Sequence, residues 1–254
     1  MQILFLIFMF VLGAAIGSFL CCQVRRDPKK PSSSLPVYSI CLHCRKKLKW
    51  YDNIPIISWL ILKGKCRNCH KKIGYAEIIS ELATAITMTM LATTINIETA
   101  TLLEWLNFVT ISIFTLTLIF LAVYDGLYGK LPTFCLILAI IFAAMSIIPA
   151  LVNNFSIQPF LSAALFGGIY LFLYLISKGK WVGDGDWLLA LAIGLALGHP
   201  WLSMIALFIA NFSACLIMYP VVKKRKKHQI YFGPFLVLSF IAVYTFSDFF
   251  ISMI

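Results

Sequence analysis

The residues with the clearest chemical signature in this sequence are four cysteines arranged as two Cys-x-x-Cys pairs. One pair is Cys41 and Cys44, the other is Cys66 and Cys69, and 21 residues separate them. Each pair forms a tight knuckle that offers two thiolates to one ion, and two knuckles complete a tetrahedral Cys₄ zinc site. Because four protein ligands leave no open coordination position, the predicted zinc is structural.

Disulfides are the competing interpretation of these cysteines. The pairs lie in a polar insert, residues 23–73, whose many basic residues indicate the reducing cytoplasm, where structural disulfides rarely persist. The adjacent His43 and His70 are expected to be solvated, since four thiolates already satisfy the ion. The four remaining cysteines lie in hydrophobic runs without paired spacing, and we expect them to pack as small apolar residues. They are Cys21, Cys22, Cys135 and Cys215.

A sparse set of carboxylates is the second candidate for chemistry. The chain has only ten Asp and Glu residues, and three of them, Asp125, Asp184 and Asp186, flank hydrophobic stretches. Ionisable residues in or beside a membrane span are costly, so they are candidates for function. Neither His-Glu-x-x-His nor Gly-x-Ser-x-Gly occurs in the sequence, which leaves metallohydrolase and serine-hydrolase chemistry without support.

The elements that must position these residues are those of a membrane protein. Of the 254 residues, 61% are hydrophobic and 12% are charged, whereas soluble domains carry about 25% charged residues. This excludes a soluble globule, and the high hydrophobicity also excludes a disordered chain. Stretches that can span, or nearly span, a hydrocarbon layer of roughly 30 Å lie at about residues 3–22, 75–95, 105–124, 133–151, 160–176, 201–222 and 231–254. A shorter apolar run covers residues 187–197.

The basic residues indicate that the short run is a separate leg. Lys and Arg stay on the cytoplasmic side of a membrane, and all 21 of them lie in four loops, at residues 25–72, 130, 178–180 and 223–227. Eight legs put these loops on one face with both termini outside, whereas seven would put the last cluster outside.

We therefore predict an all-α polytopic protein of the cell inner membrane, with about eight transmembrane helices and a small cytoplasmic Cys₄ zinc-binding insert. This topology accounts for the formal net charge of +11, so no nucleic-acid partner is predicted. No internal repeat is expected.

The short leg places the aspartates at an unusual depth. Eleven or twelve helical residues rise about 18 Å, so one end of the leg lies below the membrane surface. The Gly183-Asp-Gly-Asp186 turn would be sunk into the cytoplasmic half, where irregular backbone must line a wet cavity or be buried. Two facing carboxylates there, one protonated and one ionised, could activate water for peptide hydrolysis. Helix capping and ion transport remain alternatives for these aspartates.

Further motifs follow one another along nearly the whole chain. They are Gly17-Ser-Phe-Leu20, the two Cys-x-x-Cys pairs, Trp50-Tyr-Asp-Asn-Ile-Pro55, Ser58-Trp59, Gly64-Lys-Cys66, Glu81-Leu82, Asp125 with Leu131-Pro132, Gly183-x-Gly-Asp186 and Phe232-Gly-Pro-Phe235. In this order they resemble the type IV prepilin peptidases, aspartic membrane proteases of the Gly-x-Gly-Asp kind.

The resemblance implies a function. It assigns Asp125 and Asp186 as the catalytic pair and a prepilin or pseudopilin as substrate, cut at the cytoplasmic face. It also implies that the new N-terminus is then methylated with S-adenosylmethionine. The expected division is a methyltransferase part, residues 1–95, and a six-helix peptidase core, residues 105–254.

The sequence departs from the family pattern at several positions. Leu188 and Thr133 stand where the family commonly has Lys and Asp or Asn, and Cys21-Cys22 replaces Asn-Val in the first helix. One alternative is a peptidase without the methyltransferase activity, and two functions of other classes compete with the peptidase itself. A zinc-bearing transporter would be expected to show matching broken helices in two repeats, and a pilus or secretion scaffold would not need both aspartates.

Overall fold

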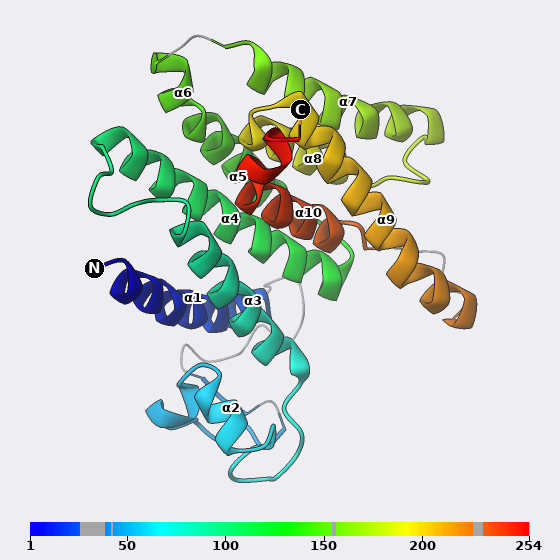
Figure 1. Cartoon of the computed structure of the whole chain (residues 1–254). Coiled ribbons are helices and arrows are strands. Elements are labelled where there is room, and N and C mark those ends of the chain that lie inside the picture. Colours follow the sequence, from blue (N-terminus) through cyan, green and yellow to red (C-terminus); the bar gives the residue numbers. More distant parts are fainter. Residues whose placement is uncertain (26–38, 42, 154–155, 226–230, 254) are drawn as a thin grey trace. The chain divides into compact units, whose positions relative to one another are not determined.

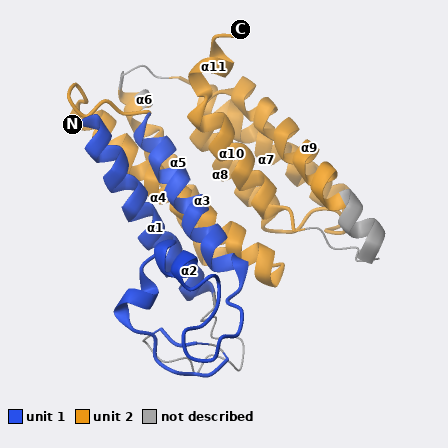
Figure 2. Ribbon diagram, turned by 60° about the horizontal axis from the view of Figure 1, so that its bottom comes forward, with its two compact units in different colours: residues 1–93 blue, residues 94–254 orange. Residues whose placement is uncertain are grey.

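The computed structural model describes residues 1–25, 39–41, 43–153, 156–225 and 231–253, and within them the chain is helical without strands (Figure 1). Residues 26–38 of the polar insert lie outside the described residues, as do Lys226 and Lys227 of the last basic cluster. The chain forms two compact units, residues 1–93 and 94–254 (Figure 2).

Unit 1 is built on two long helices, α1 (Gln2–Arg25) and α3 (Tyr75–Ala92), which pack side by side. Small residues allow the close approach. A Cβ on Gly17 would lie 2.7 Å from the carbonyl oxygen of Ser80, and a Cβ on Gly13 would lie 2.8 Å from Cα of Ala85. Glycines four residues apart are a common contact surface between membrane helices, because they let two backbones meet.

Between these helices the chain forms the polar insert. Its described part contains two short helices, η2 (Trp50–Asn53) and α2 (Ile57–Ile61). Two isolated antiparallel bridges, Ile40 with Lys47 and Lys65 with Lys72, close the loops that hold the cysteines.

Unit 2 contains the remaining helices, each rich in apolar residues. They are α4 (Leu102–Tyr128), α5 (Thr133–Ser146), α6 (Ile148–Asn153), α7 (Gln158–Ser177), α8 (Asp186–Leu197), α9 (Pro200–Arg225), α10 (Gly233–Thr245) and α11 (Ser247–Ile251). Every hydrophobic stretch predicted from the sequence coincides with at least one helix. The predicted all-α membrane architecture is therefore confirmed.

The lengths of the helices differ. Among the residues that the structure describes, four candidate spans, in α1, α4, α7 and α9, are long and apolar enough to cross a membrane, while α5, α8 and α10 are shorter apolar helices. Two predicted stretches are each divided into two helices, at Ile147 and at Phe246. Near the first break, Pro149 lacks the backbone N–H that would bond to the preceding turn, which explains why α5 does not continue.

The short helix α8 lies in the core of unit 2. Side chains on all its faces are buried, including those of Leu189, Ala190 and Ile193 at 0% exposure. It packs closely on α7, where the Ser162 hydroxyl donates a 2.6 Å hydrogen bond to the carbonyl oxygen of Gly194. A helix that is apolar on every side is expected to be buried on every side. This burial fixes the position of Asp186, its first residue.

Candidate functional site

The cysteine pairs form two knuckles of the same local geometry. In the first, the N–H of Arg45 donates to the carbonyl oxygen of Cys41 at 2.8 Å, and in the second the N–H of His70 donates to that of Cys66 at 2.9 Å. Arg45 and His70 each have φ of 55°. His43 and His70 are both exposed, as predicted.

The resemblance between the knuckles extends to their sequences, Cys-Leu-His-Cys-Arg-Lys-Lys-Leu at residues 41–48 and Cys-Arg-Asn-Cys-His-Lys-Lys-Ile at residues 66–73. The expectation of no internal repeat is therefore wrong for the insert. An eight-residue unit is too short to show in a scan for repeated domains, yet it is enough to specify one metal-binding turn.

The four thiols converge on one point. The sulfur atoms of Cys41, Cys44, Cys66 and Cys69 all lie within 4.8 Å of one another, and the Sγ atoms of Cys41 and Cys69 are 3.9 Å apart. In a tetrahedral site with Zn–S bonds of about 2.3 Å, sulfur atoms are separated by about 3.8 Å. The thiols therefore fit a closed zinc site without rearrangement of the backbone.

The electrostatic surroundings of the thiols differ. The backbone N–H groups of Cys69 and Asn68 lower the pKa of the Cys66 thiol, whereas burial raises that of Cys41. Zinc binding needs all four as thiolates, so it would release protons from the cluster.

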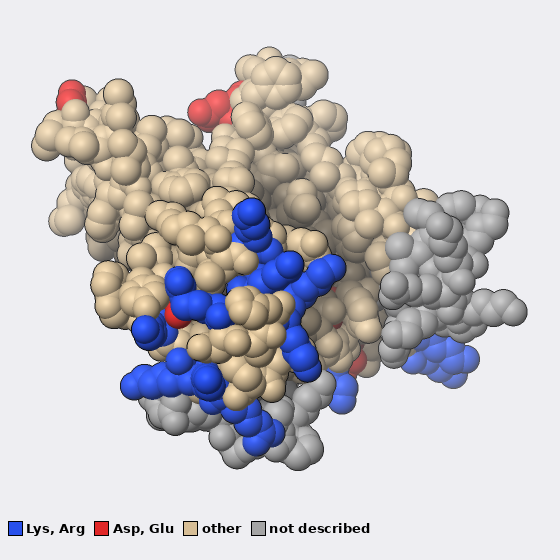
Figure 3. Space-filling model, turned by 90° about the horizontal axis from the view of Figure 1, so that it is seen from below, with Lys and Arg blue, Asp and Glu red and all other residues tan. Residues whose placement is uncertain are grey.

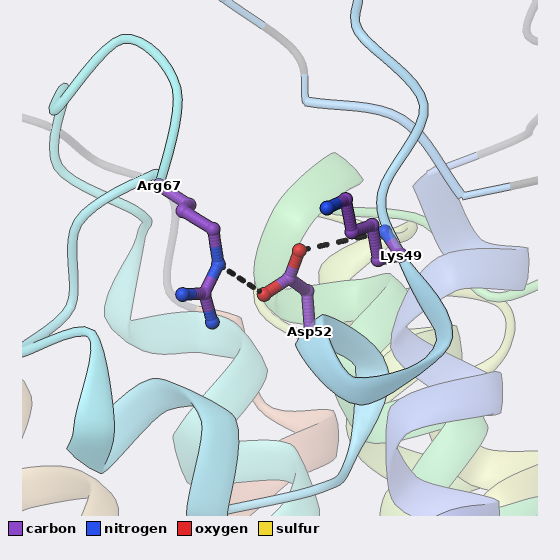
Figure 4. Close-up of polar contacts among 3 residues, drawn as sticks. All are labelled: Lys49, Asp52 and Arg67. Carbon is purple, nitrogen blue, oxygen red and sulfur yellow. Dashed lines mark hydrogen bonds and ion pairs between the residues drawn. The ribbon is translucent and has the colours of Figure 1, made fainter.

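An ion pair joins the second knuckle to the helix η2. Arg67, between the two cysteines of that knuckle, donates from Nε to Oδ1 of Asp52 at 2.9 Å (Figure 4). The backbone N–H of Lys49 also donates to Asp52. The Asp52 side chain is only 5% exposed, so this pair holds the Trp50–Asn53 segment against the cysteines.

The first candidate catalytic residue, Asp125, lies in the last turns of α4 and is 6% exposed. Its Oδ2 accepts a hydrogen bond of 3.0 Å from the N–H of Gly233, at the start of α10. One turn after Asp125, Gly129 ends α4 with φ of 63°, and its N–H donates to the Asp125 carbonyl oxygen. The side chain is thus held between the end of one helix and the beginning of another.

The second candidate, Asp186, is the first residue of α8, where the sequence places it. It is half-buried, and its Oδ2 accepts a 3.0 Å hydrogen bond from the N–H of Gly183 in the same turn. The carboxylate therefore bonds back to the turn that precedes α8.

Gly185 allows the loop that follows Asp125 to pack closely against the turn that precedes Asp186. A Cβ on Gly185 would lie 2.8 Å from the side chain of Leu131, which follows Asp125 in the chain. The loop after α4 thus lies against the glycine turn before α8. Asp184, in contrast, is exposed to solvent.

Sequence reasoning missed Tyr170 on α7. Its side chain is 2% exposed, and its ring packs on Phe232 with centroids 5.7 Å apart. Nδ2 of Asn211 donates to that hydroxyl at 3.3 Å. A buried tyrosine hydroxyl usually has a polar partner. The occurrence of Tyr170 within an apolar helix was therefore the signal that could have marked it.

Comparison with known proteins places these features in a family. A model of the bacterial Peptidase A24 N-terminal domain matches residues 11–95. The type 4 prepilin-like proteins leader peptide-processing enzyme of Escherichia coli O78:H11 is 30% identical, over 91% of this chain and 90% of the relative. The chain belongs to the prepilin leader peptidase family.

Other relatives in this family match over almost their entire length. A prepilin leader peptidase/N-methyltransferase of Vibrio cholerae is 27% identical over 96% of this chain and 98% of the relative. A prepilin leader peptidase/N-methyltransferase of Bacillus subtilis is 29% identical over 96% of this chain and 95% of the relative. No solved structure gives a significant match. Family membership and the apolar helices together make this an integral membrane protein.

Proposed function

We propose that this protein is an aspartic endopeptidase of the cell inner membrane that removes the leader peptide of type IV prepilins or pseudopilins. The observation that carries the proposal is that the loop after Asp125 packs, through Leu131, against the Gly185 turn that ends at Asp186. Two carboxylates from distant segments are each held by a glycine N–H, at 3.0 Å in both cases, in a membrane protein whose relatives bear the name prepilin leader peptidase.

The two aspartates would share the proton chemistry of hydrolysis. One carboxyl group keeps a proton, because two neighbouring carboxylates do not both ionise at low cost. The ionised partner takes a proton from water as the water oxygen attacks the peptide carbonyl carbon, and the protonated partner donates to the carbonyl oxygen. Collapse of this intermediate breaks the C–N bond, and the amine leaves with a proton from the pair.

Methylation of the new N-terminus is the second proposed activity. The relatives' printed names include N-methyltransferase. Bound S-adenosylmethionine would supply the methyl group, and the amine would lose a proton as the N–C bond forms and the S–C bond breaks. We assign this activity to residues 1–95 and the peptidase to residues 105–254.

The proposed zinc site would stabilise the methyltransferase part, residues 1–95. The fit of the four thiols to tetrahedral coordination favours a structural zinc that folds the insert. The insert and the aspartates would face the cytoplasm with both termini outside, since this arrangement keeps all basic loops on one side.

Mass spectrometry of a prepilin co-expressed with this protein tests both activities together. Cleavage lowers the mass of the prepilin by the mass of its leader peptide, and methylation adds one methyl group to the new N-terminus. A prepilin that keeps its leader when this protein is present in the membrane would contradict the proposed peptidase.

A further inference from the structure

The short helix α2 of the polar insert presents an apolar face to the outside of unit 1. Ile57, Leu60 and Ile61 are 55%, 58% and 70% exposed. Because they occupy positions i, i+3 and i+4, they lie on one side of the helix. A group of large apolar side chains left exposed in this way marks a surface that contacts another protein or a membrane.

Two contacts hold α2 against the first turns of α3. The ring of Trp59, within α2, lies 5.9 Å from the ring of Tyr75, the first residue of α3, measured between centroids. The N–H of Ile56, just before α2, donates to Oε2 of Glu81 at 2.7 Å. The exposed face of α2 therefore has a fixed place beside the beginning of α3.

The beginning of α3 lies where the membrane begins. Tyr75, Ile79, Leu82 and Ile86 recur every three or four residues and are all exposed, so they form one apolar stripe along the helix. In an integral membrane protein such a stripe contacts lipid. Tyrosine is enriched where the hydrocarbon layer meets water, and here it is the first residue of the stripe. The helix α2 is thus held at the depth of the lipid headgroups.

Basic side chains surround α2. Residues 39–74 contain nine Lys and Arg residues but a single acidic one, Asp52, which is already paired with Arg67. All nine basic residues are exposed, and Figure 3 shows Lys and Arg side chains gathered over the insert. Anionic lipids attract basic side chains that lie close to the membrane surface. The charge of the insert is therefore complementary to an anionic headgroup layer.

Two of these lysines stand opposite each other. Lys65 and Lys72 form an isolated antiparallel bridge, and like charges directly opposite in such a pair are destabilising. The bridge begins where α2 ends, because the N–H of Lys65 donates to the carbonyl oxygen of Leu62 at 3.0 Å. A phosphate group bound by both lysines would remove their repulsion. The pair thus points to an anion beside the apolar face.

We propose that α2 and the Lys65–Lys72 bridge together form a docking face that binds anionic phospholipids of the membrane that α3 enters. The apolar side chains of α2 would lie between the upper parts of the acyl chains, and the two lysines would share a headgroup phosphate. Long lysine side chains allow the charged groups to stay at the headgroups while the helix lies deeper. An apolar helix face bordered by lysines is typical of segments that lie in the membrane interface.

This inference concerns how the insert is held at the membrane, and it does not depend on either proposed activity. The distribution of basic loops across the membrane accounts for the presence of lysines on one side. It does not account for an exposed apolar face next to them. A partner protein or a second copy of this chain could also cover such a face, so the test must identify what touches it.

Photo-crosslinking of the zinc-loaded, full-length protein identifies the molecule that contacts α2. Benzoylphenylalanine in place of Leu60 is irradiated in nanodiscs that contain phosphatidylcholine and phosphatidylglycerol in a ratio of about three to one, and mass spectrometry reads the headgroup of each adduct. We expect lipid adducts in which phosphatidylglycerol is enriched at least about threefold over the mixture, because each nearby lysine adds attraction to an anionic lipid.

The matched position is Ile86, which belongs to the apolar stripe of α3. Benzoylphenylalanine there should give lipid adducts in the ratio of the mixture, since neither glutamine nor lysine chemistry but only an apolar stripe surrounds it. Lys65→Gln/Lys72→Gln should lower the enrichment at residue 60 to that ratio. Lys178→Gln/Lys180→Gln, which removes two exposed charges in unit 2, should keep the enrichment.

A salt series on the unsubstituted lysines tests the charge recognition without any change in folding. Electrostatic screening shortens the Debye length from about 10 Å at 0.1 M salt to about 3 Å at 1 M. The enrichment at residue 60 should therefore disappear at 1 M NaCl, while lipid adducts continue to form through the apolar contact.

Three results would overturn the proposal. One is the absence of lipid adducts at residue 60 when residue 86 gives them. Another is an adduct at residue 60 with a prepilin or a second copy of this chain in place of lipid, which would assign the face to a protein. The third is an enrichment of phosphatidylglycerol that is equal at residues 60 and 86, or that survives both the lysine substitutions and 1 M NaCl.

Discussion

The backbone N–H of Gly233 donates a 3.0 Å hydrogen bond to Oδ2 of Asp125, joining residues 108 positions apart in the chain. The contact leaves no room for a side chain, because a Cβ on Gly233 would lie 2.9 Å from the same oxygen. Gly233 therefore positions a proposed catalytic carboxylate by its lack of a side chain as well as by its N–H.

Gly233→Ala should slow leader cleavage without preventing folding. The added methyl group would displace the Asp125 carboxylate from its donor. A hydrogen bond to a charged group is worth about 1.5–3 kcal/mol, and about 1.4 kcal/mol corresponds to tenfold in rate. We expect a loss of at least about tenfold in the initial rate of cleavage by the purified protein.

The matched control is Gly168→Ala in α7, where a Cβ would have no atom within 4 Å. It should cleave at the wild-type rate. Equal rates for the two variants would show that the Gly233 contact does not position Asp125.

Metal analysis should find about one zinc per chain, bound by Cys41, Cys44, Cys66 and Cys69. Cys66→Ser should lose the metal and lower the thermal unfolding temperature, because metal binding also folds the insert. Cys215→Ser, which changes an exposed cysteine outside the cluster, should keep both the zinc and the stability. Wild-type protein prepared without chelators and containing no zinc would contradict the assignment.

The topology predicts which single cysteines react with a reagent that cannot cross the membrane. Cysteines introduced at Lys47, Lys130 and Lys180 should react only from the cytoplasmic side, and one at Glu98 only from the outside. Labelling of residue 180 from outside would require a different number of crossings between the insert and α8.

The close packing of α1 on α3 should make Gly17 sensitive to substitution. A Cβ there would lie 2.7 Å from the Ser80 carbonyl oxygen and 2.9 Å from Cα of Glu81. Gly17→Val should therefore destabilise the protein by about 1–3 kcal/mol, the usual cost of overpacking. Ala15→Val, on the exposed side of the same helix, should leave the unfolding temperature unchanged.

The sequence was most informative where chemistry is local. The start of α8 at Asp186 follows from a carboxylate and two glycines before an apolar run. Both cysteine knuckles follow in the same way, because each is specified by eight consecutive residues.

What could not be predicted depends on segments far apart in the chain. The donor to Asp125 is a backbone N–H, which carries no side-chain signal, and it comes from the start of α10. Tyr170 reaches Phe232 of the segment before α10 and Asn211 of α9 only through the packing of α7. The helix breaks at Ile147 and Phe246 could not be predicted either, because the apolar residues continue through both positions.

The central claim is that Asp125 and Asp186 carry out leader cleavage, and cleavage of a purified prepilin by three Asn variants tests it most directly. Asp125→Asn and Asp186→Asn should each abolish cleavage while keeping membrane expression and zinc content. The exposed Asp184→Asn should cleave within about twofold of wild type, since surface substitutions change little. Full activity in either of the first two variants, or loss of activity in the Asp184 variant alone, would contradict the assignment.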